Sequence, residues 1–376
     1  MQDTVPSLPK LSVWERCVLT LSLIPLPLVV LCNFLTSPLS PRNKGKTNAR
    51  VVFDSTARYV LARCDIRQLQ HVSGTTYAAY TSWLKQSKAP AVVEKLDNGA
   101  RLLWVGAKRT DRVVIYCHGG GFVGPLSDFQ CAFWARVQEQ LFSKHNGQFI
   151  GVAVLEYSLW PAAFPSQLTQ LMAAVSHVFA SGVHPSNLYL AGDSAGANLI
   201  LQLVSHSLHP LTISPSVSTS PLSLDDSHPI GGIILVSPWI SLTCDGGSFK
   251  ANSDLDIIPA WRLASWGTAY LAPISPSQHP YVQVLTPASP ETWLSGIQNL
   301  VQRVFITAGG NEGLRDDVVH LSETLKKVHK DVRIEVQPGA VHADPIFDVA
   351  AKSKGLSYVT GMITDWLAEG NGRPGF

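Results

Sequence analysis

Short apolar runs alternate with longer amphipathic stretches along most of the chain. Short runs rich in Val, Ile and Leu are typical of buried strands, and the stretches between them carry apolar residues at helical spacing. The expected strands cover 113–116, 150–155, 188–191, 232–236, 303–307 and 332–336, and the expected helices cover 166–180, 197–206 and 316–328. This alternation predicts an α/β fold with a mostly parallel central sheet flanked by helices.

Other segments depart from this alternation. Two strand-like runs, 91–95 and 101–105, surround Asn98-Gly99, a pair that suits a tight type I′ hairpin turn. Residues 208–229 are rich in Ser and Pro and are expected to form a surface loop. Apolar residues recur at roughly helical spacing over 47–70, and 248–293 is rich in Trp, Tyr and Pro. We expect elements of about 47–85 and 248–293 to form part of a lid over a pocket. The alternative for 248–293 is irregular packing at the edge of the fold.

The N-terminal region predicts a membrane anchor that precedes a main domain over 47–376. Residues 1–17 are polar and mixed, whereas 18–36 contain no charged residue and approach the ~20 residues that cross a bilayer as a helix. Pro25 and Pro27 interrupt this segment, which a membrane helix tolerates. A cleaved signal peptide and a buried hydrophobic hairpin are the alternatives to a membrane anchor. The length of the uncharged segment and the lack of a clear A-x-A cleavage site after it argue against a signal peptide.

The basic residues around this segment leave its orientation open. Arg42, Lys44, Lys46 and Arg50 follow it, and by the positive-inside rule they favour a cytosolic main domain. Basic residues at positions 10 and 16, on the other side, oppose that orientation.

The composition excludes several classes of function. The chain is 45% hydrophobic with a formal net charge of +2, and no Lys/Arg block stands out, so we expect a globular protein without a nucleic-acid partner. None of the 6 Cys lies in a C-x-x-C pair, so no zinc or redox motif is indicated.

A G-x-S-x-G sequence at 192–196 carries the most specific chemical signal. It follows the expected strand 188–191 and precedes an expected helix, which is the context of a nucleophile elbow. Flanking glycines let neighbouring backbone pass the strained turn, and the helix N-terminus adds positive potential. Ser194 is therefore the candidate nucleophile.

A glycine run at 118–122, His-Gly-Gly-Gly-Phe, follows the strand 113–116. Consecutive glycines can point backbone N–H groups into a cavity, where they stabilise the oxyanion of a tetrahedral intermediate. A phosphate-binding loop would need a following Lys-Ser/Thr pair, and Val123-Gly124-Pro125 supplies none. We expect His118 to shape this loop rather than to act as a base.

A serine nucleophile needs a histidine to take its proton and a carboxylate to orient that histidine, in the chain order Ser, acid, His for this elbow. Glu312 follows the strand 303–307, and His342 follows the strand 332–336. Among the competitors, His320 and His329 are expected to be solvated. Asp316 and Asp317 are expected to begin a helix, and Asp344 is too close to His342 in sequence to be its usual partner.

Together these motifs resemble the hormone-sensitive-lipase-like esterases of the α/β-hydrolase fold, which carry H-G-G-G and G-D-S-A-G. The resemblance covers about 112–349. Tyr157-Ser158-Leu159-Trp160-Pro161 is similar to a family segment, with Ser158 and Ala162 in place of an Arg and a Glu. Glu312 stands where the family usually has Asp.

The resemblance implies that Ser194 attacks an ester carbonyl, with His342 as general base and Glu312 as its partner. The N–H groups of Gly120, Gly121 and Ala195 would hold the oxyanion, beneath a helical lid, with no metal or organic cofactor. The anchored layout is similar to fungal steryl-acetate deacetylases. We therefore expect a single-pass protein of the endoplasmic reticulum whose substrate is a short acyl ester, foremost acetyl, of a hydrophobic alcohol.

The triad leaves other acyl-transfer reactions open, because amidases, thioesterases and acyltransferases share the acyl-enzyme. A biosynthetic tailoring hydrolase that acts on one dedicated substrate would use the same triad. The plant gibberellin receptor keeps this fold without the catalytic histidine, and the presence of His342 disfavours such a non-catalytic receptor.

Overall fold

The computed structural model describes residues 10–211, 224, 227–352 and 357–370. Residues 1–9 of the polar N-terminal segment, and most of the Ser- and Pro-rich loop expected at 208–229, lie outside the described residues.

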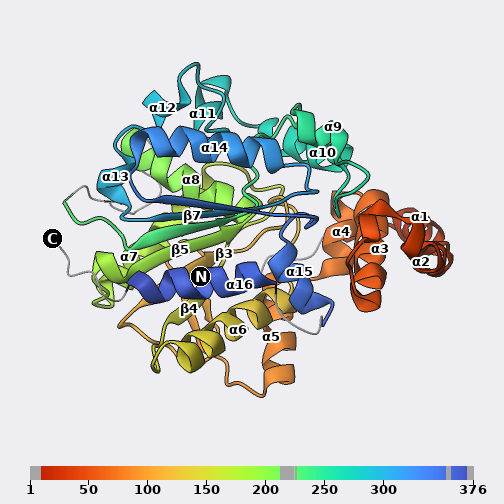
Figure 1. Cartoon of the computed structure of the whole chain (residues 1–376), viewed down its shortest axis with the longest axis horizontal. Coiled ribbons are helices and arrows are strands. Elements are labelled where there is room, and N and C mark those ends of the chain that lie inside the picture. The colour runs from red at the N-terminus through yellow and green to blue at the C-terminus, as the bar shows by residue number, and fades with distance from the viewer. Residues whose placement is uncertain (1–9, 212–223, 225–226, 353–356, 371–376) are drawn as a thin grey trace.

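One sheet of eight strands runs through the molecule (Figure 1), in the order β1-β2-β4-β3-β5-β6-β7-β8. The β1–β2 and β2–β4 pairs are antiparallel and the others are parallel, which confirms the predicted mostly parallel sheet. The strands are β1 (Val93–Lys95), β2 (Arg101–Trp104), β3 (Val113–Cys117), β4 (Gly151–Glu156), β5 (Leu188–Asp193), β6 (Gly232–Val236), β7 (Val304–Gly309) and β8 (Val332–Gln337).

Helices cover both faces of this sheet. One face packs on α7 (Ser166–Ala180), α8 (Ala195–Leu208) and α14 (Arg315–Val328). The other packs on α5 (Thr76–Ser87), α6 (Asp128–Lys144), α15 (Asp344–Ala350) and α16 (Tyr358–Glu369). The three helices of the first face match the predicted ones to within two residues at each end. Helices α6 and α16 were not predicted.

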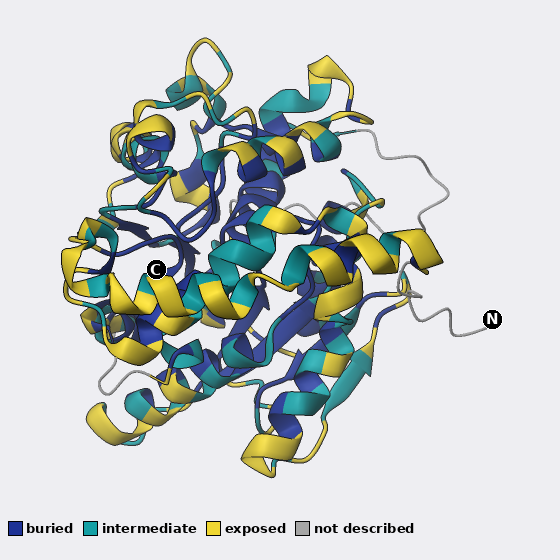
Figure 2. Cartoon of the chain, turned by 90° about the vertical axis from the view of Figure 1, so that its right-hand side faces the viewer, coloured by how far each residue is buried: buried dark blue, intermediate teal, exposed yellow. Residues whose placement is uncertain are grey.

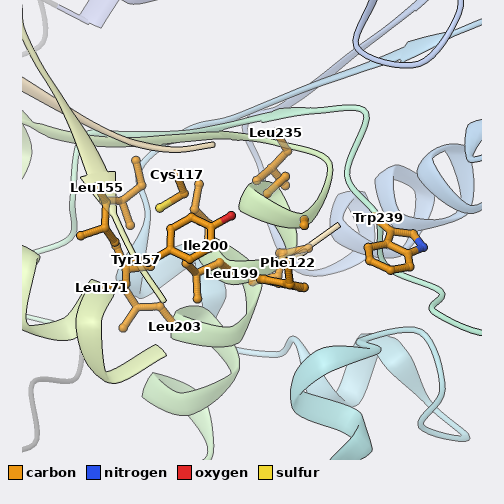
Figure 3. Close-up of a cluster of buried hydrophobic side chains, with 14 of the residues drawn as sticks. Cys117, Phe122, Leu155, Tyr157, Leu171, Leu199, Ile200, Leu203, Leu235 and Trp239 are labelled. Atoms are coloured by element: carbon orange, nitrogen blue, oxygen red, sulfur yellow. The ribbon is translucent and has the colours of Figure 1, made fainter. Parts of the chain in front are cut away.

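The two cores follow from alternation along the central strands, whose side chains point to opposite faces. In β3, Val113, Ile115 and Cys117 belong to the core beneath α7 and α8, whereas Val114 and Tyr116 belong to the core beneath α6 and α16. Figure 3 shows the first core, where side chains of β3 and β4 meet those of α7 and α8. Parallel strands buried on both faces explain why the sequence runs are apolar without alternation.

The predicted hairpin is present, but its turn differs from the expectation. Strands β1 and β2 pair with Lys95 opposite Arg101, so five residues connect them. A type I′ turn needs positive φ at both central residues, and of the Asn98-Gly99 pair only Gly99 has one, at 81°. The type I′ assignment was therefore wrong.

The remaining helices gather beside the carboxyl ends of the parallel strands, where α1–α4 and α9–α10 lie in Figure 1. They are α1 (Val13–Leu23), α2 (Leu26–Leu35), α3 (Asn48–Arg63), α4 (Ile66–Ser73), α9 (Gly247–Ala251) and α10 (Ala260–Leu271). Short helices α11 (His279–Val282), α12 (Pro290–Trp293) and α13 (Ile297–Leu300) follow, and single 3-10 turns occupy Ser37–Leu39, Pro41–Asn43, Pro185–Asn187 and Pro276–Gln278.

Helices α1 and α2 form a single apolar unit with a break at Ile24–Pro25. The helix starts earlier than the uncharged segment because Ser12 and Glu15 form a capping box. The break is explained by Pro25 and Pro27, which have no N–H for the helical ladder. Within the described residues, Val13–Leu35 is the stretch long and apolar enough to cross a bilayer.

Candidate active site

Ser194 lies at a sharp turn between β5 and α8, as the G-x-S-x-G context predicted. Its backbone has φ 53° and ψ −119°, a conformation that side-chain-bearing residues rarely adopt. Its N–H donates to the Val236 carbonyl of the neighbouring strand at 2.9 Å, and its carbonyl accepts from the Trp239 N–H at 3.1 Å. The sheet and the loop after β6 therefore hold the strained turn in place.

Close backbone approach explains the glycine that ends this motif. A Cβ at Gly196 would lie 1.9 Å from the carbonyl oxygen of Cys117 and 2.7 Å from that of His118. The first turn of α8 thus packs directly on the end of β3, from which the glycine run starts. The two motifs can lie this close because Gly196 has no side chain at the contact.

The glycine run places two free backbone donors beside Ser194. Gly120 and Gly121 have φ of 114° and 64°, and Gly120 accepts hydrogen bonds from Val123 and Gly124 through its carbonyl. Within the described part of the chain, the N–H groups of Gly120 and Gly121 donate to no protein acceptor. The Gly119 N–H, in contrast, donates to Asp193 at 2.8 Å.

Asp193, one residue before the nucleophile, ties the glycine run to the sheet. Its buried carboxylate accepts from the Gly119 N–H, from the Tyr116 hydroxyl and, at 3.2 Å, from Gln130. A carboxylate with several donors holds them in a fixed geometry. Asp193 thereby engages the Gly119 N–H, whereas the next two glycines line the cavity without a described acceptor for their N–H groups.

His118 is buried and shapes the loop, as expected. Its Nδ1 lies 2.7 Å from the Gly119 carbonyl and its Nε2 lies 3.3 Å from the Thr76 hydroxyl. The ring stacks on Tyr157 with centroids 4.5 Å apart. Burial lowers the pKa of His118 to about 4, so the imidazole is neutral.

Glu312 and His342 meet at the carboxyl edge of the sheet, from the loops after β7 and β8. The carboxylate Oε2 of Glu312 lies 3.7 Å from Nδ1 of His342, which is longer than a hydrogen bond. Both side chains are buried, and Oε1 of Glu312 and Nδ1 of His342 have no hydrogen-bond partner among the described residues. Unliganded acid–base pairs are often this loose and tighten with substrate bound.

Ser237 and Asp256 brace this pair, and sequence reasoning assigned a role to neither. The Ser237 hydroxyl donates to Glu312 at 2.5 Å and accepts the Ala343 N–H at 3.0 Å. Asp256, fully buried, accepts the His342 N–H at 2.9 Å and the Gly313 N–H at 2.8 Å. Each of these two side chains therefore joins the acid loop to the histidine loop.

The electrostatics around His342 favour its cationic form. Burial alone would lower the pKa of His342, but the carboxylates of Glu312, Asp256 and Asp193 raise it above the ordinary value. Burial raises the pKa of Glu312, which His342 partly offsets. An imidazole that gains a proton during a reaction is stabilised by this arrangement.

Ser194 and His342 border the same cavity, which has a volume of about 280 Å³. Ser194, His342, Gly120 and Gly121 lie in its lining, and Ala195 follows Ser194 as the first residue of α8. The apolar walls come from α3, α4 and the region around α10, namely Phe53, Ala57, Val60, Leu61, Leu69, Ile258 and Trp266. Both segments expected to contribute a lid thus supply the apolar walls of this cavity.

The competing histidines lie elsewhere. His320 is exposed on α14, as expected. The expectation that His329 is solvated was wrong: it is 4% exposed, and its Nε2 contacts the Val301 carbonyl at 2.8 Å. The chain past the end of α14 turns back against the 300–301 segment and buries this ring. Asp316 and Asp317 lie in the first turn of α14, where acidic side chains favour a helix.

Comparison with known proteins identifies the family of the chain. A family model described as alpha/beta hydrolase fold matches residues 114–344, more than half of the chain. An acetyl-hydrolase of Streptomyces hygroscopicus is 28% identical over 244 residues, which are 64% of this chain and 70% of that protein. A Schizosaccharomyces pombe protein with the provisional name steryl acetyl hydrolase is 25% identical over 170 residues, 44% of this chain and 41% of that one.

Among solved structures, an esterase of the bacterial hormone-sensitive lipase family superposes with a TM-score of 0.63. The superposition covers 87% of this chain and 100% of that one at 24% identity. This likeness shows a shared fold.

Proposed function

The chain belongs to the alpha/beta hydrolase fold family, and from that premise we propose that it is an esterase that hydrolyses short acyl esters through Ser194, His342 and Glu312. The observation that carries this proposal is the shared cavity. The strained serine, a buried histidine and two unengaged backbone donors line it together.

In the proposed reaction, the Ser194 oxygen attacks the ester carbonyl carbon while His342 takes the hydroxyl proton. The carbonyl oxygen becomes an oxyanion, which accepts hydrogen bonds from the N–H groups of Gly120, Gly121 and Ala195. The carbon–oxygen bond to the alcohol then breaks, and His342 returns its proton to the leaving alcohol. A water molecule, deprotonated by His342, then attacks the acyl-enzyme in the same way, which releases the acid and restores the Ser194 hydroxyl.

We propose an acetyl or similarly short acyl group on a bulky hydrophobic alcohol. A cavity of about 280 Å³ is at the small end for a ligand site, and its walls are largely apolar. The names of the two relatives, an acetyl-hydrolase and a steryl acetyl hydrolase, point to the same acyl group.

We further propose that the apolar helix Val13–Leu35 anchors the enzyme in the endoplasmic reticulum membrane in a single pass, and that α3, α4 and α10 form the lid. The helix has the length and composition for the first role. The side chains that these three helices contribute to the apolar walls support the second.

The test is hydrolysis of p-nitrophenyl acetate, butyrate and octanoate by the full chain in detergent. We expect the highest kcat/KM with acetate, no activity in Ser194→Ala, and a loss of at least about a hundredfold in Glu312→Ala. Ser181→Ala, which removes an exposed hydroxyl at the end of α7, is the matched control and keeps wild-type activity. Wild-type activity in Ser194→Ala would refute the mechanism.

A further inference from the structure

A second apolar depression lies on the other side of α3 from the cavity that holds Ser194. It is an open groove of about 510 Å³ between α2, the first half of α3 and the end of α15. Its walls include Phe34 of α2, Ala49 and Val52 of α3, and Ala350 and Lys352 at the end of α15. None of these residues lines the cavity around Ser194.

One aromatic side chain, Phe53, borders both the groove and the cavity, and two further rings of the cavity wall pack against it. Its ring lies 6.0 Å from that of Phe129 and 5.6 Å from that of Phe347, and the latter two are 5.8 Å apart, centroid to centroid. All three side chains line the cavity and are only partly buried. Because these side chains are only partly buried, part of each ring has no packing partner that a change of rotamer would have to displace.

The groove opens beside the surface that a bilayer would contact. Helix α2 forms one of its walls, and large apolar side chains of the same helix face outward: Leu28 is 64% exposed, Leu31 52% and Leu35 67%. The helices that face the viewer in Figure 2 are mostly exposed along their outer surfaces. Exposed large apolar side chains that gather on one helix are typical of an interaction surface.

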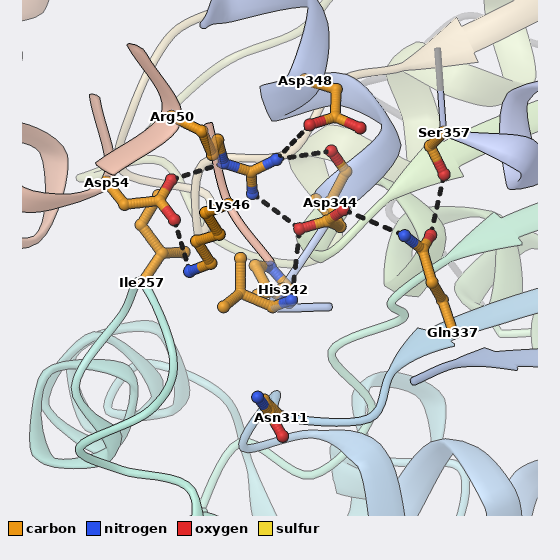
Figure 4. A network of polar contacts seen from close by, with 12 residues as sticks. Lys46, Arg50, Asp54, Ile257, Asn311, Gln337, His342, Asp344, Asp348 and Ser357 are labelled. Carbon is orange, nitrogen blue, oxygen red and sulfur yellow. Dashed lines mark hydrogen bonds and ion pairs between the residues drawn. The ribbon is translucent and has the colours of Figure 1, made fainter. Parts of the chain in front are cut away.

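The width of the groove is fixed by a buried ionic network (Figure 4). The guanidinium of Arg50 on α3 contacts Asp54 of its own helix at 2.6 Å, and Asp344 and Asp348 of α15 at 2.7 and 2.6 Å. Two walls of the groove are therefore joined rigidly at their base. The groove thus lies between helices α3 and α15, which buried ion pairs hold together.

We propose that this groove is the entry for esters dissolved in the membrane, with Phe53, Phe129 and Phe347 as the gate to Ser194. The occupant is the apolar alcohol of the substrate, which passes from the bilayer along α2 and turns the rings aside. This inference rests on the proposed esterase function and names the route by which that site receives its substrate.

The test compares a membrane-borne ester with a water-soluble one. Full-length enzyme is given cholesteryl acetate in phosphatidylcholine vesicles, or p-nitrophenyl acetate in solution, and rates are divided by the amount of enzyme that cosediments with the vesicles. Val52→Glu places a charge in the groove. Val72→Glu, on α4 and outside both the groove and the cavity, is the matched control, since the two valines are 40% and 50% exposed.

We expect Val52→Glu to lose about tenfold or more of the vesicle rate per bound enzyme, because a carboxylate in an apolar path must be desolvated as substrate passes. Its rate on p-nitrophenyl acetate stays at the wild-type value, and Val72→Glu keeps both rates. Ala49→Trp, which fills the groove without a charge, gives the same selective loss.

Equal vesicle rates for wild type, Val52→Glu and Ala49→Trp would overturn the route. A wild-type enzyme that fails on p-nitrophenyl acetate would instead contradict the esterase function itself, so the two failures are distinguishable.

Discussion

Replacing Arg50 by methionine removes the cation that Asp54, Asp344 and Asp348 share (Figure 4). The Arg50 side chain is 3% exposed, and burial alone would lower its pKa, but the three carboxylates raise it above the ordinary value. Methionine keeps most of the length and apolar volume. The perturbation is therefore the loss of three charge-assisted contacts in a buried setting.

The expected loss of unfolding free energy depends on the contacts that the carboxylates keep when Arg50 is replaced. Asp54 keeps its ion pair with Lys46 at 2.6 Å, and Asp344 keeps hydrogen bonds from Val341 and Gln337 at 3.3 Å. Removing one partner of a buried ion pair typically costs about 3–5 kcal/mol because charge is left uncompensated. We expect Arg50→Met to lower the free energy of unfolding by about that amount.

Urea denaturation of the two proteins measures this difference as a shift of the midpoint at unchanged slope. The control is Arg136→Met on α6, where the arginine side chain is 52% exposed and lies 3.5 Å from Glu139. An exposed pair contributes about 0–1 kcal/mol, so the control should stay near wild type. If the two variants were destabilised equally, the network would not tie α3 to α15 as argued.

Three further predictions concern the proposed site. Neighbouring carboxylates raise the pKa of His342 above 6.5, so kcat/KM on p-nitrophenyl acetate should fall on acidification with its midpoint above pH 6.5. Glu312→Gln removes one of these carboxylates and should move the midpoint to lower pH. Asp256→Asn should lower kcat about tenfold or more with little change in KM, because it misplaces the His342 loop. The control is Asp254→Asn, which changes a fully exposed side chain and should leave kcat and KM unchanged. Gly196→Ala, whose Cβ would lie 1.9 Å from a carbonyl oxygen, should cost about 3 kcal/mol or more, seen as a lowered Tm.

The sequence predicted the central strands and the nucleophile turn because their signals are local. The apolar run of β5, the motif around Ser194 and the start of α8 are contiguous, so one stretch of chain specifies the whole unit. Glu312 and His342 were predicted as candidates by the same logic, because each follows a strand at the carboxyl edge of a parallel sheet, and the structure places them 3.7 Å apart.

Residues that act across long sequence separations had no such signal. Asp256 contacts His342 and Gly313 from a segment without clear periodicity. Arg50 looked like one more basic residue after the apolar segment, and only the packing of α3 on α15 shows its three partners. The missed helix α6 did carry a local signal, the Ser127–Gln130 capping box.

The central claim is that Ser194 forms the acyl-enzyme. Rapid quenching of the enzyme with p-nitrophenyl acetate in acid, followed by peptide mass mapping, tests it most directly. We predict one added acetyl group on the peptide that contains Ser194, absent in Ser194→Ala, which also releases no nitrophenol. An acetyl group on another residue, or nitrophenol release by Ser194→Ala at the wild-type rate, would contradict the account.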